Sequence, residues 1–213
     1  MSNYSQEFDA ALWDTELPLK KNNAKLLPLL TGSKVPDITF QKDMGIWQKV
    51  SYKFNYTQAT IHSIIDSKPL VISFLSGGWN NYGLKHMQLL KQTYNEIVAL
   101  GGNLLVVVHA SYPDVREMVQ FFDIPFNVIA DPKNEISEKF GLYSPNVPIW
   151  DKVSGISEEV PMPATYVLNQ YGNVTYHTID EDFTHTFSAT KVLGAVFAAV
   201  NRVPYTAKLN YAA

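Results

Sequence analysis

The stretch that decides the fold runs from Pro69 to Val108 and reads PLVISFLSGGWNNYGLKHMQLLKQTYNEIVALGGNLLVVV. Its first seven residues form a mostly apolar run, which is typical of a strand covered on both faces. After Gly77–Gly78, apolar side chains recur on one helical face, and Gly101–Gly102 ends this helix. The face comprises Leu84, Met87, Leu90, Tyr94, Ile97 and Val98. A second apolar run, from Asn103 to Val108, completes a strand–helix–strand unit, which predicts two parallel strands joined by a right-handed crossover.

The rest of the chain adds further strands and helices on either side of this unit. Ser111 and Asp131–Pro132 are typical helix starts, and Ser188 is expected to cap a final helix. The sequence Asn169-Gln-Tyr-Gly172 predicts a hairpin turn between two late strands. Short strands are expected at 38–40, 126–129, 164–168 and 173–178, and short helices near 61–65 and after Asp131. This order predicts an α/β protein with a mixed sheet flanked by helices.

Length and composition limit the classes of protein that the chain can belong to. It has 213 residues, of which 46% are hydrophobic and 17% charged, so it is expected to fold around a core. We expect an N-terminal helical extension over 1–31, one domain over 32–201 and a C-terminal tail over 202–213. The net charge of −3 argues against nucleic-acid or anionic-membrane partners. Apolar runs are too short for a membrane span, and the polar first ten residues lack a signal-peptide pattern, so we expect a cytoplasmic protein.

The most informative count is that of cysteine, which is zero. The chain can therefore form no disulfide, thiolate nucleophile, thiolate metal ligand or iron–sulfur cluster. This excludes chemistry rather than a compartment, because a chain without thiols is compatible with either redox state.

The segment Phe74-Leu-Ser-Gly-Gly-Trp-Asn-Asn-Tyr-Gly83 is similar to a redox motif that has lost its cysteines. It resembles the motif F-Y-R-G-G-W-C-P-Y-C of the peroxiredoxin-like (AhpC/TSA) branch of the thioredoxin superfamily, without a gap. Asn80 and Gly83 occupy the two cysteine positions, and Asn81 occupies the proline position. The resemblance implies a thioredoxin-like fold with three layers.

Three further segments resemble the same family in the same order, so that the resemblance covers roughly residues 32–200. Residues 32–40, GSKVPDITF, are similar to its opening motif G-x-x-A-P-D-F-x-L. Residues 160–167, VPMPATYV, resemble its P-x-P-A-T-x-V loop, which implies a cis bond between Met162 and Pro163. Residues 180–184, DEDFT, resemble its D-x-D-Y-T segment.

The residues contradict the chemistry of that family. A peroxidatic or disulfide-exchanging site needs a thiolate at the start of a helix, where the helix dipole lowers the thiol pKa. An asparagine side chain is no comparable nucleophile, and glycine has none. The resemblance also implies an arginine near the thiolate, but the only arginines, Arg116 and Arg202, lie outside these motifs. Family membership would therefore imply the fold alone.

The histidines and acidic residues offer weaker candidates for a site. His86, three residues after Gly83, could be a proton donor, although a solvent-facing position is the commoner case. His109 ends the second strand, where a partly buried structural role is expected. His177, Asp180, Asp182 and His185 have no spacing that fixes a metal site, so we expect no metal and read them as an acidic loop. Lys20, Lys21 and Lys25 are expected to form a solvated face.

These observations favour a protein that has neither catalytic residues nor a cofactor. We expect it to bind a peptide or protein partner at the vestigial site. The expected binding residues are Trp79, Asn81, Tyr82, Met162 and Pro163. An extended peptide could pair with the backbone of the Met162–Pro163 loop by strand addition, with Trp79 as an apolar wall. The alternative is an enzyme with non-thiol chemistry that uses Asn80, Tyr82 or His86. The sequence leaves the ligand open and also leaves open whether the protein is a homodimer.

Overall fold

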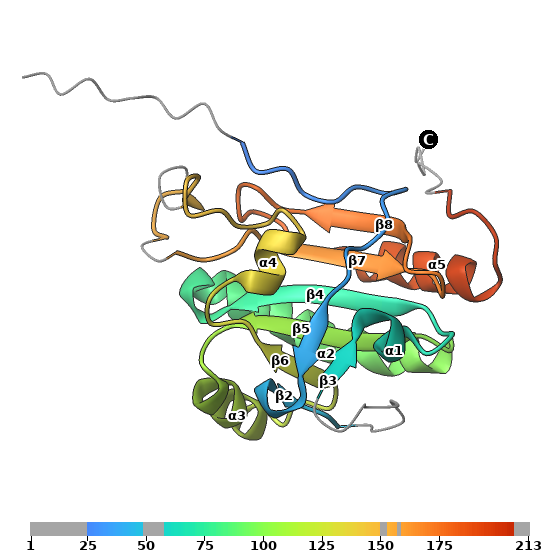
Figure 1. Ribbon diagram of the computed structural model, residues 1–213, viewed down its shortest axis with the longest axis horizontal. Helices are drawn as coiled ribbons and strands as arrows, with labels where there is room; N and C mark the ends of the chain where they lie inside the picture. The colour runs from blue at the N-terminus through green and yellow to red at the C-terminus, as the bar shows by residue number, and fades with distance from the viewer. Residues whose placement is uncertain (1–24, 49–57, 150–152, 157–158, 207–213) are drawn as a thin grey trace, which may run out of the picture.

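The computed structural model describes residues 25–48, 58–149, 153–156 and 159–206, and its centre is a six-stranded sheet with helices on both faces (Figure 1). Helices α2 (Asn81–Ala99) and α5 (Ala189–Val200) lie together behind this sheet in the view of Figure 1. The short helix α4 (Glu135–Lys139) lies in front of it. A two-stranded sheet of β1 (Thr39–Gln41) and β3 (Gln58–Thr60) also lies in front. The predicted three-layer arrangement is therefore confirmed.

The six-stranded sheet has the order β2-β6-β5-β4-β7-β8 and mixes parallel with antiparallel pairs. Strands β4, β5 and β6 are parallel to one another, whereas β2, β7 and β8 run antiparallel to their neighbours. The strands are β2 (Gly45–Ile46), β4 (Leu70–Ser76), β5 (Asn103–His109), β6 (Asn127–Ala130), β7 (Ala164–Leu168) and β8 (Val174–Ile179). The parallel half precedes the antiparallel pair along the chain, as the sequence predicts.

The central strand β4 is buried along all of its seven residues, which explains its almost continuous apolar sequence. It pairs with β5 from Leu70 opposite Asn103 to Ser76 opposite His109. Because the two strands are parallel, their carboxyl ends lie side by side at Ser76 and His109. This edge of the sheet carries the motif of residues 74–83.

Side-chain caps fix the starts of two outer helices at Ser111 and Ser188, as the sequence predicts, whereas α4 begins at Glu135 rather than directly after Asp131–Pro132. Ser111 accepts a hydrogen bond from the Asp114 amide and caps α3 (Tyr112–Phe121), and Ser188 caps α5 in the same way through Lys191. Helix α1 (Ile61–Ile65) begins with a reciprocal cap between Thr60 and Ser63. These caps satisfy amides that have no partner inside the helix.

A segment near the N-terminus lies along the outer edge of β8. The Gly32 amide donates to the Val174 carbonyl and the Val174 amide donates to the Ser33 carbonyl, both at 2.8 Å. The Val35 amide donates to the Gly172 carbonyl at 2.9 Å, and Lys34 forms a bridge with Asn173. The first part of β8 therefore has backbone partners on both sides.

The expectation of an N-terminal helical extension needs correction. Residues 26–30, which we expected in a helical extension, form no helix, and Leu29 instead donates to the Phe140 carbonyl. Pro28 explains this, because proline supplies no amide to a helix interior. Residues 1–24, with Lys20 and Lys21, lie outside the described residues. Within the described part of the chain, no helix combines the length and apolarity needed to cross a membrane.

The sequence does not predict the position of strand β2. It contains two residues, Gly45 and Ile46, which pair with Ile129 and Val128 at the edge of the sheet. A pairing of this length leaves almost no periodic pattern in the sequence.

Candidate functional site

The vestigial redox motif lies where β4 ends and α2 begins. Ser76 ends β4 and caps a 3-10 turn, η3 (Gly77–Trp79), by accepting a hydrogen bond from the Gly78 amide at 3.1 Å. Asn80 follows this turn, and α2 starts at Asn81. The first cysteine position of the family therefore lies at the N-terminus of a long helix, where the fold of a thiol enzyme would hold its thiolate.

Asn80 has an unusual backbone conformation, with φ 53° and ψ −135°. Residues other than glycine rarely adopt a positive φ, and asparagine tolerates it better than most. Its exposed side chain donates a hydrogen bond to the Gly155 carbonyl at 3.2 Å. This bond ties the start of α2 to the irregular segment before β7.

Gly83 is buried and leaves no room for a side chain. A β-carbon at this position would lie 2.7 Å from the Ser76 carbonyl oxygen and 3.6 Å from the β-carbon of Trp79. The first turn of α2 therefore packs backbone to backbone against the end of β4. A cysteine at position 83 would require this contact to open.

Trp79 and Met162 are part of the hydrophobic core, with 1% and 6% of their surfaces exposed. The indole N–H of Trp79 donates to the Pro161 carbonyl at 3.0 Å, and its ring packs edge-on against Tyr82 and Phe183. Pro163 is also buried, and Tyr82 is half-buried. Of the residues expected to bind a partner, only Asn81 is exposed, together with Asn80.

The Met162–Pro163 bond is trans, so the expectation of a cis bond is wrong. The trans form is the intrinsically favoured one for an X-Pro bond. The loop also leaves little backbone for strand addition. The Met162 amide donates to Leu142, the Pro163 carbonyl accepts from Asp180, and the Pro161 carbonyl accepts from Trp79. A peptide would have to displace these bonds to pair with the loop.

His86 is buried and hydrogen-bonded, so the expectation of a solvent-facing residue is wrong. Its Nε2 lies 2.8 Å from the Ser73 hydroxyl, which is also 2.7 Å from the hydroxyl of Thr165. The bonds join α2 to the neighbouring strands β4 and β7. Burial lowers the pKa of His86 from 6.5 to about 4, and the nearby Asp180 carboxylate raises it only in part. His86 is therefore neutral at pH 7.

The surroundings of His86 do not suit acid–base catalysis. The cavity beside it, lined by Tyr82, Thr165 and Asp180 among others, has a volume of about 10 Å³. That volume is close to the minimum for one water molecule and too small for a substrate. Burial raises the pKa of the Tyr82 phenol, and the Asp180 carboxylate raises it further. Neither group exchanges protons readily near pH 7.

The other histidines and acidic residues have structural partners. His177 Nδ1 lies 2.9 Å from the Thr31 hydroxyl, and the Asp180 carboxylate accepts from the amides of Asp182 and His185. Among the described residues, no three side chains of the types His, Cys, Asp and Glu are grouped to hold a metal ion. His109 is half-buried, as expected, with its Nδ1 at 3.3 Å from the Asp131 carbonyl.

An apolar cavity of about 250 Å³ opens beside Asn80 and Gly83, between α2 and α3. It lies over the carboxyl ends of β4 and β5, which is where open α/β sheets commonly bind ligands. Its apolar lining includes Leu75, Leu84, Met87, Val108, Met118 and Phe122. Leu84, expected on the buried face of the helix, is 45% exposed and lies in this lining.

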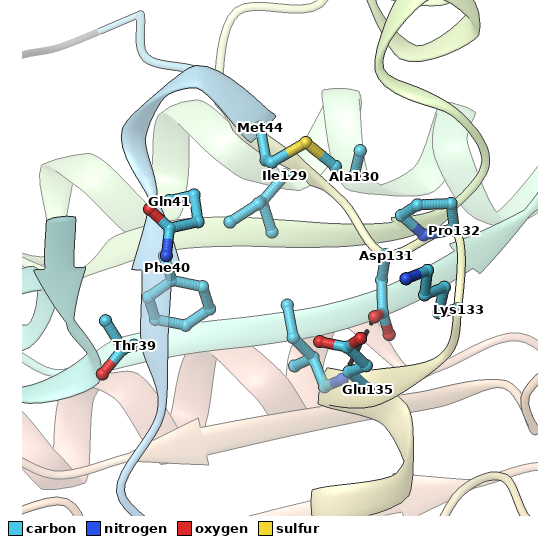
Figure 2. Close-up of a pocket in the computed structure, with 11 residues that line it drawn as sticks. Thr39, Phe40, Gln41, Met44, Ile129, Ala130, Asp131, Pro132, Lys133 and Glu135 are labelled. Carbon is cyan, nitrogen blue, oxygen red and sulfur yellow. Dashed lines mark hydrogen bonds between the residues drawn. The ribbon is translucent and has the colours of Figure 1, made fainter. Parts of the chain in front are cut away.

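A second cavity, of about 210 Å³, lies at the carboxyl end of β6, with Thr39 and Phe40 on one side and Pro132 and Lys133 on the other (Figure 2). The buried carboxylate of Asp131 in this lining is hydrogen-bonded to the first turn of α4. It accepts from the amides of Ile136 and Ser137 and from the Ser137 hydroxyl, at 2.8 to 3.1 Å. Its lining shares no residue with the redox motif or with the cavity beside Asn80.

Comparison with known proteins agrees with the fold described above, which is the thioredoxin-like fold of peroxiredoxins. The model of the AhpC/TSA family matches residues 31–177, which is more than half of the chain. The chain therefore belongs to the AhpC/TSA family, although it has no cysteine. A search of the curated proteins finds no match.

Solved structures of peroxiredoxins share the fold at low sequence identity. The peroxidoxin BcpB from Mycobacterium tuberculosis is 12% identical with a TM-score of 0.58, and the match covers 82% of this chain and 98% of that one. The reduced 2-Cys peroxiredoxin from Plasmodium vivax is 12% identical with a TM-score of 0.62, covering 82% and 84%. AhpC from Mycobacterium tuberculosis is 15% identical with a TM-score of 0.60, covering 81% and 93%. At these identities the likeness concerns the fold alone.

Sequence reasoning missed the apolar cavity and the burial of His86. His86 is four residues before Leu90 and eleven before Ile97, both fully buried, so helical spacing alone could have placed it on the inner face. The cavity has no such signal, because it depends on the separation of α2 from α3.

Proposed function

We propose that the protein is a non-catalytic member of the AhpC/TSA family, a pseudoenzyme that binds a ligand at the vestigial redox site. The observation that carries this proposal is the apolar cavity that opens at Asn80, where the family motif has its first cysteine. The position that holds the reactive cysteine in the family motif then borders a binding cavity without taking part in chemistry.

The arrangement around Asn80 supports this function better than a function on the Trp79 side. Trp79, Met162 and Pro163 are packed into the interior, and their loop has few free backbone groups. Asn80 and Asn81 are exposed at the start of α2. A ligand or partner would therefore approach over these two asparagines and the cavity.

The alternative of an enzyme with non-thiol chemistry has less support. The perturbed histidine that such an enzyme could use, His86, has 1% of its surface exposed and is engaged with Ser73. A general acid or base must lie within hydrogen-bonding reach of its substrate. The small cavity beside His86 gives no such access.

The first test measures peroxide consumption. Purified, metal-free protein is mixed with hydrogen peroxide or an alkyl hydroperoxide and a thiol reductant, and we expect no turnover above the buffer blank. Turnover would contradict the proposal, because the chain contains no thiol that could form the sulfenic acid intermediate.

The second test asks whether the vestigial site binds anything. Because the native chain has no cysteine, Asn81→Cys creates a unique thiol for a maleimide–benzophenone photo-crosslinker. Gln92→Cys, exposed farther along α2, is the matched control. In extracts of the native cells, we expect adducts from position 81 that position 92 does not give. Identical adducts from both positions, or none, together with no shift of the cavity methyl signals by any small ligand, would show that the site is a structural relic.

A further inference from the structure

The cavity between α2 and α3 has features that define the class of ligand it would take, and this inference rests on the function proposed above. Its interior lining is aliphatic, aromatic and thioether, with methionines from both helices, Met87 and Met118. Methionine side chains adapt to ligands of irregular shape and make favourable contacts with aromatic rings. The lining of the cavity therefore favours a ligand with an apolar surface.

Size limits the ligand to a small molecule. The cavity volume of about 250 Å³ is below the usual range for drug-sized ligands, which begins near 300 Å³. An apolar cavity of about 150 Å³ is already large enough to bind benzene. A single substituted ring or a short branched alkyl group fits between these limits.

Charge limits the ligand further. Among the described residues that line the cavity, Asp114 alone carries a formal charge, and the remaining polar groups are the side chains of Ser76 and Asn80. The Asp114 carboxylate accepts a hydrogen bond from the Ser111 hydroxyl at 2.5 Å, so it is held at the start of α3. The Lys91 ammonium donates to the Phe122 carbonyl but does not line the cavity. A carboxylate ligand would meet the like charge of Asp114 and no cationic side chain in the described lining, so that the N-terminal amides of α2 alone would attract it.

We propose that this cavity binds a small, uncharged, apolar molecule with about one ring, and that it discriminates against carboxylates. The exposed part of Leu84 would be covered when the ligand binds. Burial of apolar surface is then the main driving force, and the three polar side chains orient any single polar substituent.

The test compares two probes that share a ring, toluene and benzoate, by NMR titration of methyl-labelled protein. We expect toluene to shift the methyl signals of Leu84, Met87, Val108 and Met118, which all line the cavity. Benzoate is expected to bind about tenfold more weakly or worse, because its charge loses hydration without a cationic partner. Asp114→Asn should narrow this gap, since it removes the like charge.

Variants that fill a cavity provide the control. Met118→Trp should weaken toluene binding about tenfold, because the larger side chain occupies the ligand space. Met44→Trp, a half-buried methionine of the other cavity, should leave toluene binding unchanged. Should Met118→Trp fail to fold, the methyl shifts of the wild-type protein still decide the location. Shifts confined to Met44, Ile129 and Ile136, or equal affinity for toluene and benzoate, would overturn the inference.

A second copy of the chain is the competing occupant, because Phe121 on α3 is 80% exposed close to the cavity-lining Phe122. Sedimentation velocity during the titration separates the cases. A dimer that dissociates as toluene binds would assign the cavity to the second copy and overturn the small-ligand proposal. If toluene fails to bind while position 81 still gives specific adducts, the ligand class is wrong but the binding function stands.

Discussion

The carbonyl oxygen of Ser76 lies 2.7 Å from the point that a β-carbon on Gly83 would occupy. Real β-carbons essentially never approach an oxygen of the backbone this closely. Because position 83 is a glycine, the first turn of α2 can pack directly against the end of β4. A cysteine at this position, as in the family motif, would not fit without a shift of the backbone.

We expect Gly83→Ala to destabilise the protein by about 1–3 kcal/mol, because the added methyl group forces β4 and α2 apart. Helix propensity alone predicts the opposite sign, a gain of about 1 kcal/mol for replacing a helical glycine with alanine. Urea unfolding at equilibrium measures the difference. Gly83→Cys should be at least as destabilised as the alanine variant.

Gly194→Ala in α5 is the matched control for this prediction. Its β-carbon would meet the ring edge of Tyr205 at 3.1 Å, a contact with a side chain that needs only a small shift and not with the backbone. The helix-propensity gain should then dominate, and the variant should be as stable as the native protein or slightly more so. Equal losses at both positions would contradict the packing argument.

Substitutions at Asn80 test the unusual backbone there. A non-glycine residue in a sparsely populated region costs on the order of 1–3 kcal/mol. Asn80→Gly relieves this strain but loses the bond to Gly155, so its free energy of unfolding should stay close to that of the native protein. Asn80→Ala loses the bond and keeps the strain, so it should be less stable than the glycine variant by about 1 kcal/mol. Thermal unfolding of both variants gives this order, and an alanine variant as stable as the glycine variant would exclude strain.

His86 should make the stability depend on pH. Its pKa is about 4 in the folded protein and 6.5 when unfolded, so the unfolded state binds more protons between these values. Above pH 6.5 His86 is neutral in both states and does not reduce the free energy of unfolding. As the pH falls from 6.5 to 4, protonation of His86 in the unfolded state lowers the free energy of unfolding. The loss by pH 4 is roughly 3 kcal/mol, at 1.36 kcal/mol per unit of pKa difference.

His86→Leu removes this titration and serves as the comparison. Urea unfolding at pH 7.5 and pH 4 should show a smaller loss of stability in the variant than in the native protein. The carboxylates titrate in both proteins, so the difference between the two losses of stability is due to His86. Equal losses of stability in the two proteins would mean that His86 reaches solvent in the folded state.

Trp79→Phe should destabilise the protein by about 1–3 kcal/mol. The phenyl ring keeps most of the apolar contacts but leaves the buried Pro161 carbonyl without its hydrogen bond. Trp47→Phe is the control, since its indole donates to the Lys42 carbonyl at an exposed position where water can replace it. Chemical unfolding should therefore show the larger loss at position 79.

Features that depend on local sequence could be predicted here, and features that depend on distant contacts could not. The apolar runs of β4 and β5, the Ser111 and Ser188 caps and the Asn169–Gly172 turn each act within a few residues, so the sequence contains their cause. The position of Asn80 at the start of α2 followed from the family motif.

The remaining features of the site result from packing between elements far apart in sequence. Trp79 is buried because the loop at Pro161, more than eighty residues away, covers it and accepts its hydrogen bond. The apolar cavity exists because α2 and α3 are separated at this end of the sheet. The apolar periodicity of either helix does not determine this separation. The burial of Trp79 and the presence of the cavity could therefore be seen only in the structure.

The bonds between residues 32–35 and the start of β8 have a consequence for self-association. A strand at the edge of a sheet offers unpaired amides and carbonyls to any passing chain, which is a common origin of aggregation. Gly32 and Ser33 occupy those groups at Val174, the first residue of β8, and Val35 pairs with Gly172 just before the strand. A truncated protein that begins after residue 35 should retain the six-stranded sheet but form concentration-dependent aggregates through the uncovered edge.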